Sequence, residues 1–188
     1  MTFAALVLAA GAGTRFGGGK LAARFRGEPL VHHAIRAARA APVDRVVVVA
    51  APGLDIGRWE PPGPPVQRVE LASGALSDTL RAGLGVLDDV AGAFVFLGDM
   101  PLVPHDVAGK LAAAIGTRLA AQPRLGDRPA HPVLLSAQAF PLVATLRGDE
   151  GAGRLLRQRT DVALVEIADP GAVFDVDYPE DIARRPDC

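Results

Sequence analysis

Hydrophobic residues along the chain occur in short continuous runs, and these runs alternate with segments in which they are spaced as on one face of a helix. A short apolar run bounded by glycine or proline is typical of a strand that is buried on both faces of a sheet. Four runs of this kind predict strands at residues 2–9, 45–51, 66–71 and 93–97. Residues 29–41 and 77–87 have the helical spacing, and Pro29 suits a first helical turn.

The second half of the chain predicts elements that follow one another more closely. The alanine-rich segment 104–121 predicts a long helix, 137–146 and 152–159 predict shorter ones, and a last helix begins at Pro179. Further strands are predicted at residues 132–135, 162–167 and 173–176.

The order of these elements predicts the fold. Strands that alternate with helices pair in parallel through right-handed crossovers, and the closely spaced later strands predict an antiparallel addition. We therefore expect an α/β fold with a mixed, mainly parallel sheet between layers of helices. The length of 188 residues fits one domain, residues 1–188.

The composition and net charge argue against nucleic acid and membranes as binding partners. The formal net charge is −1 at pH 7, whereas a nucleic-acid surface needs a clustered basic face. No apolar run reaches the ~18 residues of a membrane span, and the apolar start has no positive charge before Arg15, unlike a signal peptide. Cys188 alone cannot form a disulfide framework. We expect a cytoplasmic protein that binds neither nucleic acid nor membranes.

The loop after the first strand has the composition of an anion site. Five glycines between Gly11 and Gly19 expose backbone N–H groups, and Arg15 and Lys20 add two cations. Backbone donors beside cations suit the phosphates of a nucleoside triphosphate (NTP). The alternative is a flexible loop with two solvated charges.

Two common phosphate-binding motifs do not fit this loop. A Walker A motif requires glycine and Ser or Thr at the positions of Thr14 and Leu21. A dinucleotide-binding fingerprint requires a third glycine where Phe16 stands, and an acidic residue where Ala50 and Ala51 close the second strand. The loop therefore predicts phosphate binding of another kind.

At this point the sequence resembles a known family. The pattern Leu-Ala-Ala-Gly-x-Gly-Thr-Arg-Phe-Gly-Gly-x-Lys at 8–20, followed by Gly-Glu-Pro-Leu at 27–30, is similar to the signature of the MobA-like NTP transferases. Further matching motifs are Ser-Asp-Thr-Leu-Arg-Ala-Gly-Leu at 77–84, Leu-Gly-Asp-Met-Pro at 97–101, Ala-His-Pro-Val-Leu at 130–134, Gly-Asp-Glu-Gly-Ala-Gly-Arg at 148–154 and Asp-Val-Asp-Tyr-Pro-Glu-Asp at 175–181. Within the family, the chain resembles most the molybdenum cofactor cytidylyltransferases.

The resemblance implies a Rossmann-like three-layer α/β/α nucleotidyltransferase fold and an activity. A Mg²⁺-dependent enzyme would move CMP from CTP to the phosphate of molybdopterin (molybdenum) cofactor and release pyrophosphate. Its partners would be the NTP, with CTP favoured, a phosphorylated pterin-type acceptor and a molybdoenzyme apoprotein. The open alternatives are a guanylyltransferase that uses GTP, a sugar-1-phosphate nucleotidyltransferase, and a non-catalytic nucleotide-binding or chaperone module for a molybdoenzyme.

Carboxylates after two predicted strands are the candidate metal ligands. Asp99 follows the strand at 93–97, and Mg²⁺ takes one or two carboxylates besides water and phosphate oxygens. The resemblance places the second ligand at Asp177, with Asp175 as substitute. Asp99 has the alternative role of turning the chain before Pro101. Asp177 has the alternative role of capping the helix that begins at Pro179.

The predicted catalytic residues are Arg15, Lys20 and Asp99. The predicted substrate-binding residues are Leu8, Ala9, Ala10, Gly11, Gly13, Thr14, Ser77, Asp78, Thr79, Gly98, His131 and Asp149. Ala10 favours CTP over GTP, since the guanylyl enzymes of the resembling family tend to have glycine there. The alternatives for His131 and Asp149 are a packed histidine and a helix cap.

Overall fold

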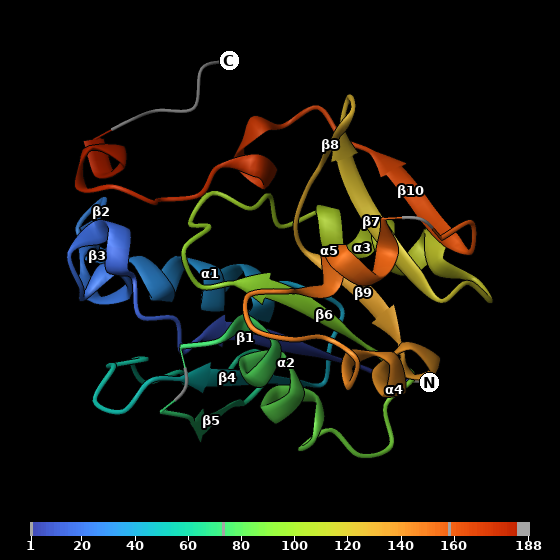
Figure 1. Ribbon diagram of the computed structural model, residues 1–188, viewed down its shortest axis with the longest axis horizontal. Coiled ribbons are helices and arrows are strands. Elements are labelled where there is room, and N and C mark those ends of the chain that lie inside the picture. The colour runs from blue at the N-terminus through green and yellow to red at the C-terminus, as the bar shows by residue number, and fades with distance from the viewer. Residues whose placement is uncertain (1, 73, 158, 184–188) are drawn as a thin grey trace.

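In the computed structural model, which describes residues 2–72, 74–157 and 159–183, a twisted sheet lies between two layers of helices (Figure 1). Among the described residues the sheet has eight strands, in the order β10-β7-β9-β6-β1-β4-β5, with β8 paired to β7. The strands are β1 (Phe3–Ala9), β4 (Arg45–Ala50), β5 (Val66–Glu70), β6 (Gly92–Leu97), β7 (Ala120–Leu125), β8 (Arg128–Pro129), β9 (Val133–Ser136) and β10 (Val162–Glu166). A separate small hairpin joins β2 (Arg24–Phe25) to β3 (Glu28–Pro29).

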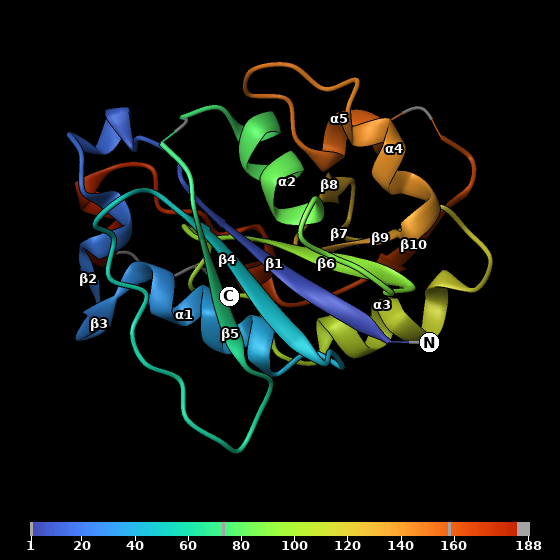
Figure 2. The ribbon, with the colours of Figure 1, turned by 90° about the horizontal axis from the view of Figure 1, so that it is seen from below.

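Helices cover both faces of the sheet (Figure 2). One face carries α1 (Leu30–Arg39) and α3 (Val107–Ile115), and the other carries α2 (Leu76–Leu84), α4 (Phe140–Val143) and α5 (Ala152–Leu156). Short 3₁₀ turns complete the chain: η1 (Thr14–Phe16), η2 (Lys20–Ala22), η3 (Ala137–Ala139), η4 (Pro170–Val173) and η5 (Pro179–Ala183).

The position of the central strand β1, covered on both faces, explains why its sequence is apolar throughout. Ala5 and Val7 pack in the core on the side of α1 and α3, whereas Leu6 and Leu8 pack in the core on the side of α2. Because successive side chains of a strand point to opposite faces, a strand covered on both faces needs apolar residues at every position. The buried strands that the sequence predicted at 2–9, 45–51 and 93–97 are confirmed on this basis.

Pairing in the sheet is mixed and mainly parallel, as predicted. β1 pairs in parallel with β4 and β6, β4 with β5, and β7 with β10, while β9 runs antiparallel to β6 and β7. The carboxyl ends of β1, β4, β5 and β6 therefore lie at one edge of the sheet. The antiparallel β9 begins at that same edge, because Val133 pairs with Val95 near the end of β6.

The prediction of one helix over residues 104–121 is wrong beyond Ile115. Helix α3 ends there, Gly116 has a positive φ of 51°, and residues 120–125 form strand β7. Alanine-rich sequence favours a helix locally, but Ala120 and Ala121 are fully buried between β9 and β10. Tertiary pairing therefore overrides the local preference.

Two further predicted elements are incorrect. Residues 173–176 form no strand, because the chain makes the 3₁₀ turn η4 and then continues extended without pairing in the sheet. The helix predicted at 137–146 is divided into η3 and the four-residue α4, with Pro141 in the first turn of α4. The hairpin of β2 and β3 was not predicted, since its strands are only two residues long.

Gly92, at the start of β6, gives a test of the close strand packing. A methyl group there would overlap the backbone carbonyl oxygen of Leu135 in β9, so Gly92→Ala is expected to lower the free energy of unfolding by about 1–3 kcal/mol. Gly109→Ala in α3 is the matched control, because open space surrounds it, and a stabilisation of about 0.5–1 kcal/mol is expected. Urea unfolding measures both. Equal stability of Gly92→Ala and the wild type would contradict the packing argument.

Candidate active site

The loop after β1 curls back on itself. Gly13, Gly17, Gly18 and Gly19 have φ angles of 58°, 87°, 94° and 64°, a region that favours glycine. The Gly18 N–H donates to the Gly13 carbonyl at 3.2 Å, and a Cβ at Gly13 would lie 2.9 Å from the Cβ of Lys20. These glycines therefore bring Lys20 back beside the end of the first strand.

Lys20 lies between two carboxylates. Its Nζ is 2.7 Å from Asp99 Oδ2 and 3.3 Å from Asp177 Oδ1, and its side chain is only 12% exposed. Arg15 reaches the other oxygen of Asp177, with 3.1 Å between Nη1 and Oδ2. The structure thus brings together all four charged residues that the sequence assigned to phosphate and metal binding.

The charges around Lys20 determine its protonation. Partial burial lowers the pKa of the ammonium group, but hydrogen bonds and the negative charges of Asp99 and Asp177 outweigh this and raise the pKa above its ordinary value. Lys20 is therefore a cation throughout the neutral pH range.

Asp99 is placed by the close approach of two strands. Gly98 donates its N–H to the Leu8 carbonyl at 3.0 Å, and a Cβ at Gly98 would lie 3.0 Å from that same oxygen. The turn after β6 therefore lies against the end of β1. Asp99 follows at the carboxyl edge of the sheet, where its side chain faces Lys20.

Asp177 reaches the site through the segment that follows η4. The Val176 N–H donates to the backbone carbonyl of Asp99 at 3.0 Å. The buried carboxylate of Asp181 accepts hydrogen bonds from the N–H groups of Asp177 and Tyr178 at 3.0 and 2.8 Å. Asp181 therefore caps η5, and the carboxylate of Asp177 faces Arg15 and Lys20. The capping role considered for Asp177 is incorrect.

Asp175, the substitute metal ligand, does not line the cavity that contains Asp177. Partial burial of its carboxyl group raises the pKa, and the charges of Asp177 and Asp99 raise it further. Within the described residues, no group of three or more His, Cys, Asp or Glu side chains forms a metal cluster. The candidate metal centre is therefore a pair of carboxylates, Asp99 and Asp177.

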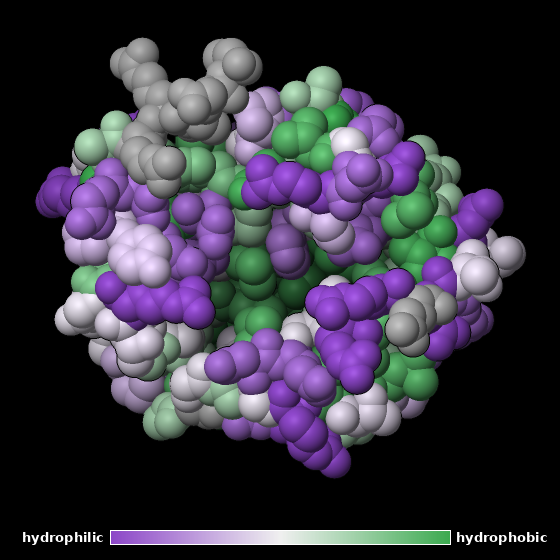
Figure 3. Space-filling model, turned by 45° about the horizontal axis from the view of Figure 1, so that its top comes forward, coloured by the Kyte–Doolittle hydropathy of each residue, from purple (hydrophilic) through white to green (hydrophobic). Residues whose placement is uncertain are grey.

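One face of the molecule is hollowed at its centre, with a hydrophobic floor and a hydrophilic rim (Figure 3). Three cavities near the carboxyl edge of the sheet concern the site. We call them the loop cavity, the carboxylate cavity and the histidine cavity.

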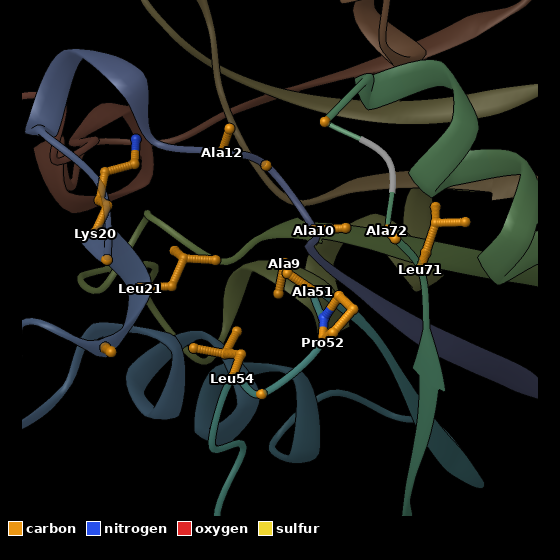
Figure 4. Close-up of a pocket in the computed structure, with 15 residues that line it drawn as sticks. Ala9, Ala10, Ala12, Lys20, Leu21, Ala51, Pro52, Leu54, Leu71 and Ala72 are labelled. Carbon is orange, nitrogen blue, oxygen red and sulfur yellow. The ribbon is translucent and has the colours of Figure 1, made fainter.

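The loop cavity has a volume of about 510 Å³ and is lined by residues 9–12, 19–22 and 51–54 and by residues 71, 72 and 74. Ala9 and Ala10 lie between Leu21 and Leu54 on one side and Leu71 on the other (Figure 4). The lining is largely apolar, which suits the faces of a nucleobase. Sequence analysis missed residues 51–54, although their place directly after β4 meets the strand-end rule for ligand sites.

The carboxylate cavity, of about 490 Å³, adjoins the loop cavity at Lys20. It is lined by residues 12–16, Lys20, Asp99, Asp149 and Asp177, among others. Thr14 and Asp149, both predicted substrate-binding residues, therefore lie in the same cavity as the charged groups.

The histidine cavity, of about 360 Å³, lies beside the ends of β1 and β6. Its lining includes Leu8, Leu97, His131, Asp149 and Arg157. A smaller cavity of about 190 Å³ connects Leu8, Leu97 and Leu76 with Ala10, Lys20 and Asp99. The structure thus places His131 near the carboxylates, and it adds Arg157, which no sequence motif singled out.

The predicted residues at the start of α2 have separate environments. Ser77 is fully buried and lines none of these cavities. Asp78 forms an ion pair with Arg81. Thr79 lines the small connecting cavity, and its hydroxyl donates to the Ala75 carbonyl at 3.0 Å.

The fold and the site together define a class. A glycine loop, two cations and two carboxylates at the carboxyl edge of a mainly parallel sheet are the arrangement of a nucleotide-dependent transferase. The chain belongs to the family of the MobA-like NTP transferase domain, which matches residues 5–163. Asp175 and Asp177 lie beyond the matched segment.

Comparison with individual proteins agrees with this assignment. The chain is 30% identical over 193 residues to "Purine catabolism protein PucB" of Bacillus subtilis, an alignment that covers 95% of this chain and 94% of that protein. The crystal structure of a Mycobacterium tuberculosis Rv0371c homolog from Mycobacterium sp. strain JC1 superposes with a TM-score of 0.81 at 26% identity, covering 96% of this chain and 93% of the other.

A nucleotidyl transferase from Methanothermobacter, Mth528, has the same fold, with a TM-score of 0.72 at 18% identity and coverage of 97% and 94%. The family and fold that the sequence predicted are confirmed, and the chain is a nucleotidyltransferase of the MobA-like family. None of the helices among the described residues has the length and apolar character that a membrane crossing requires.

Proposed function

We propose that this nucleotidyltransferase uses Mg²⁺ to move CMP from CTP to the phosphate of molybdopterin cofactor. An oxygen of the acceptor phosphate attacks the α-phosphorus of CTP, the bond from that phosphorus to the bridging oxygen breaks, and pyrophosphate leaves. The observation that carries the proposal is the convergence of Asp99 and Asp177 on one cation, Lys20 Nζ.

The two carboxylates fit a divalent metal. Both lie within 3.3 Å of one point, the position of Lys20 Nζ, and Mg²⁺ takes one or two carboxylates with water and phosphate oxygens. When bound, the metal would neutralise phosphate charge and orient the pyrophosphate leaving group. A structure of Rv0371c from Mycobacterium tuberculosis was solved in complex with manganese, which supports the use of a divalent metal ion.

Lys20 and Arg15 are the groups that would hold the triphosphate. The pyrophosphate gains negative charge as it leaves, so cations placed on it stabilise the transition state more than the bound substrate. The acceptor phosphate is already an anionic nucleophile. The protein therefore only has to orient it, and no covalent intermediate on the protein is required.

Ala10 supports the choice of CTP. Its side chain is 4% exposed and its residue lines both the loop cavity and the small connecting cavity, so its methyl group takes space beside the proposed base site. Ala10→Gly is expected to raise the use of GTP relative to CTP by roughly tenfold, since one methyl group contributes ~1 to 3 kcal/mol to discrimination. The measurement is competition between CTP and GTP for one acceptor preparation. An unchanged ratio would contradict the role of the methyl group.

The activity itself is tested by pyrophosphate release with each of the four NTPs and molybdopterin cofactor. Release with CTP and this acceptor is the expected result. A wild-type preference for GTP would make the chain a guanylyltransferase, and release only with sugar 1-phosphates would overturn the acceptor. Nucleotide binding without release under every condition would favour the non-catalytic module. The product would then pass to a molybdoenzyme apoprotein.

A further inference from the structure

One wall of the loop cavity is a tight turn at residues 51–54. The Leu54 N–H donates to the Ala51 carbonyl at 3.2 Å, and Gly53, between them, has a φ of 77°. Proline in the second position and a glycine with positive φ in the third are typical of a type II turn. All four residues line the cavity, and Figure 4 shows Ala51, Pro52 and Leu54 in this wall.

The side chain of Arg68 joins the two ends of this turn. Arg68 lies in the edge strand β5, and its Nη1 donates to the Leu54 carbonyl at 2.5 Å while its Nη2 donates to the Ala51 carbonyl at 2.9 Å. Glu70, at the end of the same strand, accepts a further hydrogen bond from Nη2 at 3.3 Å. A guanidinium group is planar and donates in fixed directions, so one side chain can hold two carbonyl groups at once. Arg68 therefore ties both ends of the turn to the sheet.

The turn opens a long connection that has no regular structure of its own. Residues 51–65 are all described, and they contain no helix or strand. Backbone without such a hydrogen-bonded framework opens at little cost in free energy unless other groups hold it. Arg68 is not among the residues that line the loop cavity. It can therefore affect a ligand in the cavity only through the turn that it holds.

A second arginine holds the later part of the same connection. Arg39 in α1 donates to the carbonyls of Glu60, Pro62 and Pro64 at 3.0, 3.3 and 3.0 Å. Its guanidinium carbon lies 5.4 Å from the centroid of the Trp59 ring. None of the residues that Arg39 contacts there lines the loop cavity. The two arginines thus support different parts of one connection, and only the part held by Arg68 faces a ligand.

We propose that Arg68 is a positioning residue for the nucleotide, because it keeps the turn at 51–54 in the conformation that receives the base. This inference rests on the proposed function, which places the base in the loop cavity. A wall that is already in its binding conformation needs no ordering when the ligand arrives, and the apparent affinity falls with the fraction of molecules in that conformation. Lys20 and Arg15 hold the phosphates in the proposed mechanism, so only the base should depend on Arg68.

The test compares a ligand that has a base with one that has none. Calorimetry in the presence of Mg²⁺ measures the binding of CTP and of pyrophosphate to the wild type and to Arg68→Ala. The dissociation constant of CTP is expected to rise about tenfold, as it does when about one molecule in ten has the competent turn. The dissociation constant of pyrophosphate should not change.

Kinetics and a conservative variant separate positioning from general support. In Arg68→Ala the KM for CTP should rise by the same factor, while kcat and the KM for the acceptor remain those of the wild type. Arg68→Lys should bind CTP with an affinity between those of Arg68→Ala and the wild type, because an ammonium group lacks the planar fork that spans two carbonyls. If Arg68→Ala does not fold, Arg68→Lys alone decides, and wild-type affinity of that variant for CTP would overturn the inference.

Arg39→Ala is the matched control, since it removes an arginine that holds carbonyls of the same connection away from the cavity. It should lower the thermal unfolding midpoint and leave CTP binding unchanged. Three results would overturn the inference: unchanged CTP binding by Arg68→Ala, equal weakening of CTP and pyrophosphate, or equal weakening of CTP by Arg39→Ala.

The inference and the proposed function fail separately. If the wild type uses another NTP, the cytidylyl proposal is wrong, and the same measurements with that NTP still test Arg68. If CMP transfer occurs but Arg68→Ala binds CTP as the wild type does, the role of Arg68 is wrong and the proposed function stands.

Discussion

Replacement of Asp99 by asparagine is expected to lower kcat by at least a factor of about a thousand while the fold remains intact. A factor of this size corresponds to about 4 kcal/mol of transition-state stabilisation, the order expected when a metal ligand is lost. The side chain of Asp99 is 26% exposed and contacts Lys20 rather than the apolar core, so its loss should not unfold the protein. Pyrophosphate release measures the rate, and the thermal unfolding midpoint measures the fold.

Asp106→Asn is the matched control for this experiment. Asp106 also pairs with a lysine at 2.7 Å, Lys110, but the pair lies exposed on α3, away from the candidate site. Its replacement removes the same charge from the same kind of ion pair and should leave kcat unchanged. If Asp99→Asn retains more than about a tenth of the wild-type activity, Asp99 is not a metal ligand in the reaction.

Lys20→Ala is expected to change nucleotide binding and metal binding in opposite directions. Without Lys20 the triphosphate loses a cation, so CTP should bind at least about tenfold more weakly and kcat should fall. The same substitution removes the ammonium group that contacts the carboxylates of Asp99 and Asp177 at 2.7 and 3.3 Å, while Arg15 still pairs with Asp177. Mn²⁺ should therefore bind more tightly to the nucleotide-free variant than to the wild type, because it no longer competes with the ammonium group.

Calorimetry with CTP and electron paramagnetic resonance with Mn²⁺ measure the two affinities separately. Lys110→Ala is the control, since it removes a lysine from an exposed ion pair with Asp106 and should change neither. A residue that merely supported the loop would weaken both ligands when it is removed. If Mn²⁺, measured without nucleotide, binds more weakly to Lys20→Ala than to the wild type, this would contradict the arrangement in which Lys20 occupies the space between the carboxylates.

The sequence predicted those elements whose conformation and burial follow from their own local composition. β1 and β4 are apolar at nearly every position because both faces are covered, so their burial can be inferred from composition alone. β7 could not be inferred, because the alanines at 120 and 121 fit a helix equally well and only pairing with β9 and β10 makes them a strand. Their conformation depends on contacts far away in the sequence.

The same distinction applies to the site. Lys20 and Asp99 follow directly after glycine turns at strand ends, so the strand-end rule finds them. The position of Asp177 depends on the Asp181 carboxylate and on a backbone hydrogen bond to Asp99, neither of which a motif reveals. Arg157 was missed because an arginine at the end of a short helix carries no pattern of its own.

The late position of Asp177 has a consequence for the synthesis of the protein. The segment that matches the family, residues 5–163, contains the glycine loop and Asp99, whereas Asp177 lies beyond β10. Chains emerge from the ribosome amino end first, and a nascent chain can begin to form its sheet before the residues that follow β10 have emerged. In the proposed mechanism such a chain has one of its two metal ligands. Nucleotide turnover would begin only when the segment after β10 has emerged and lies against the sheet.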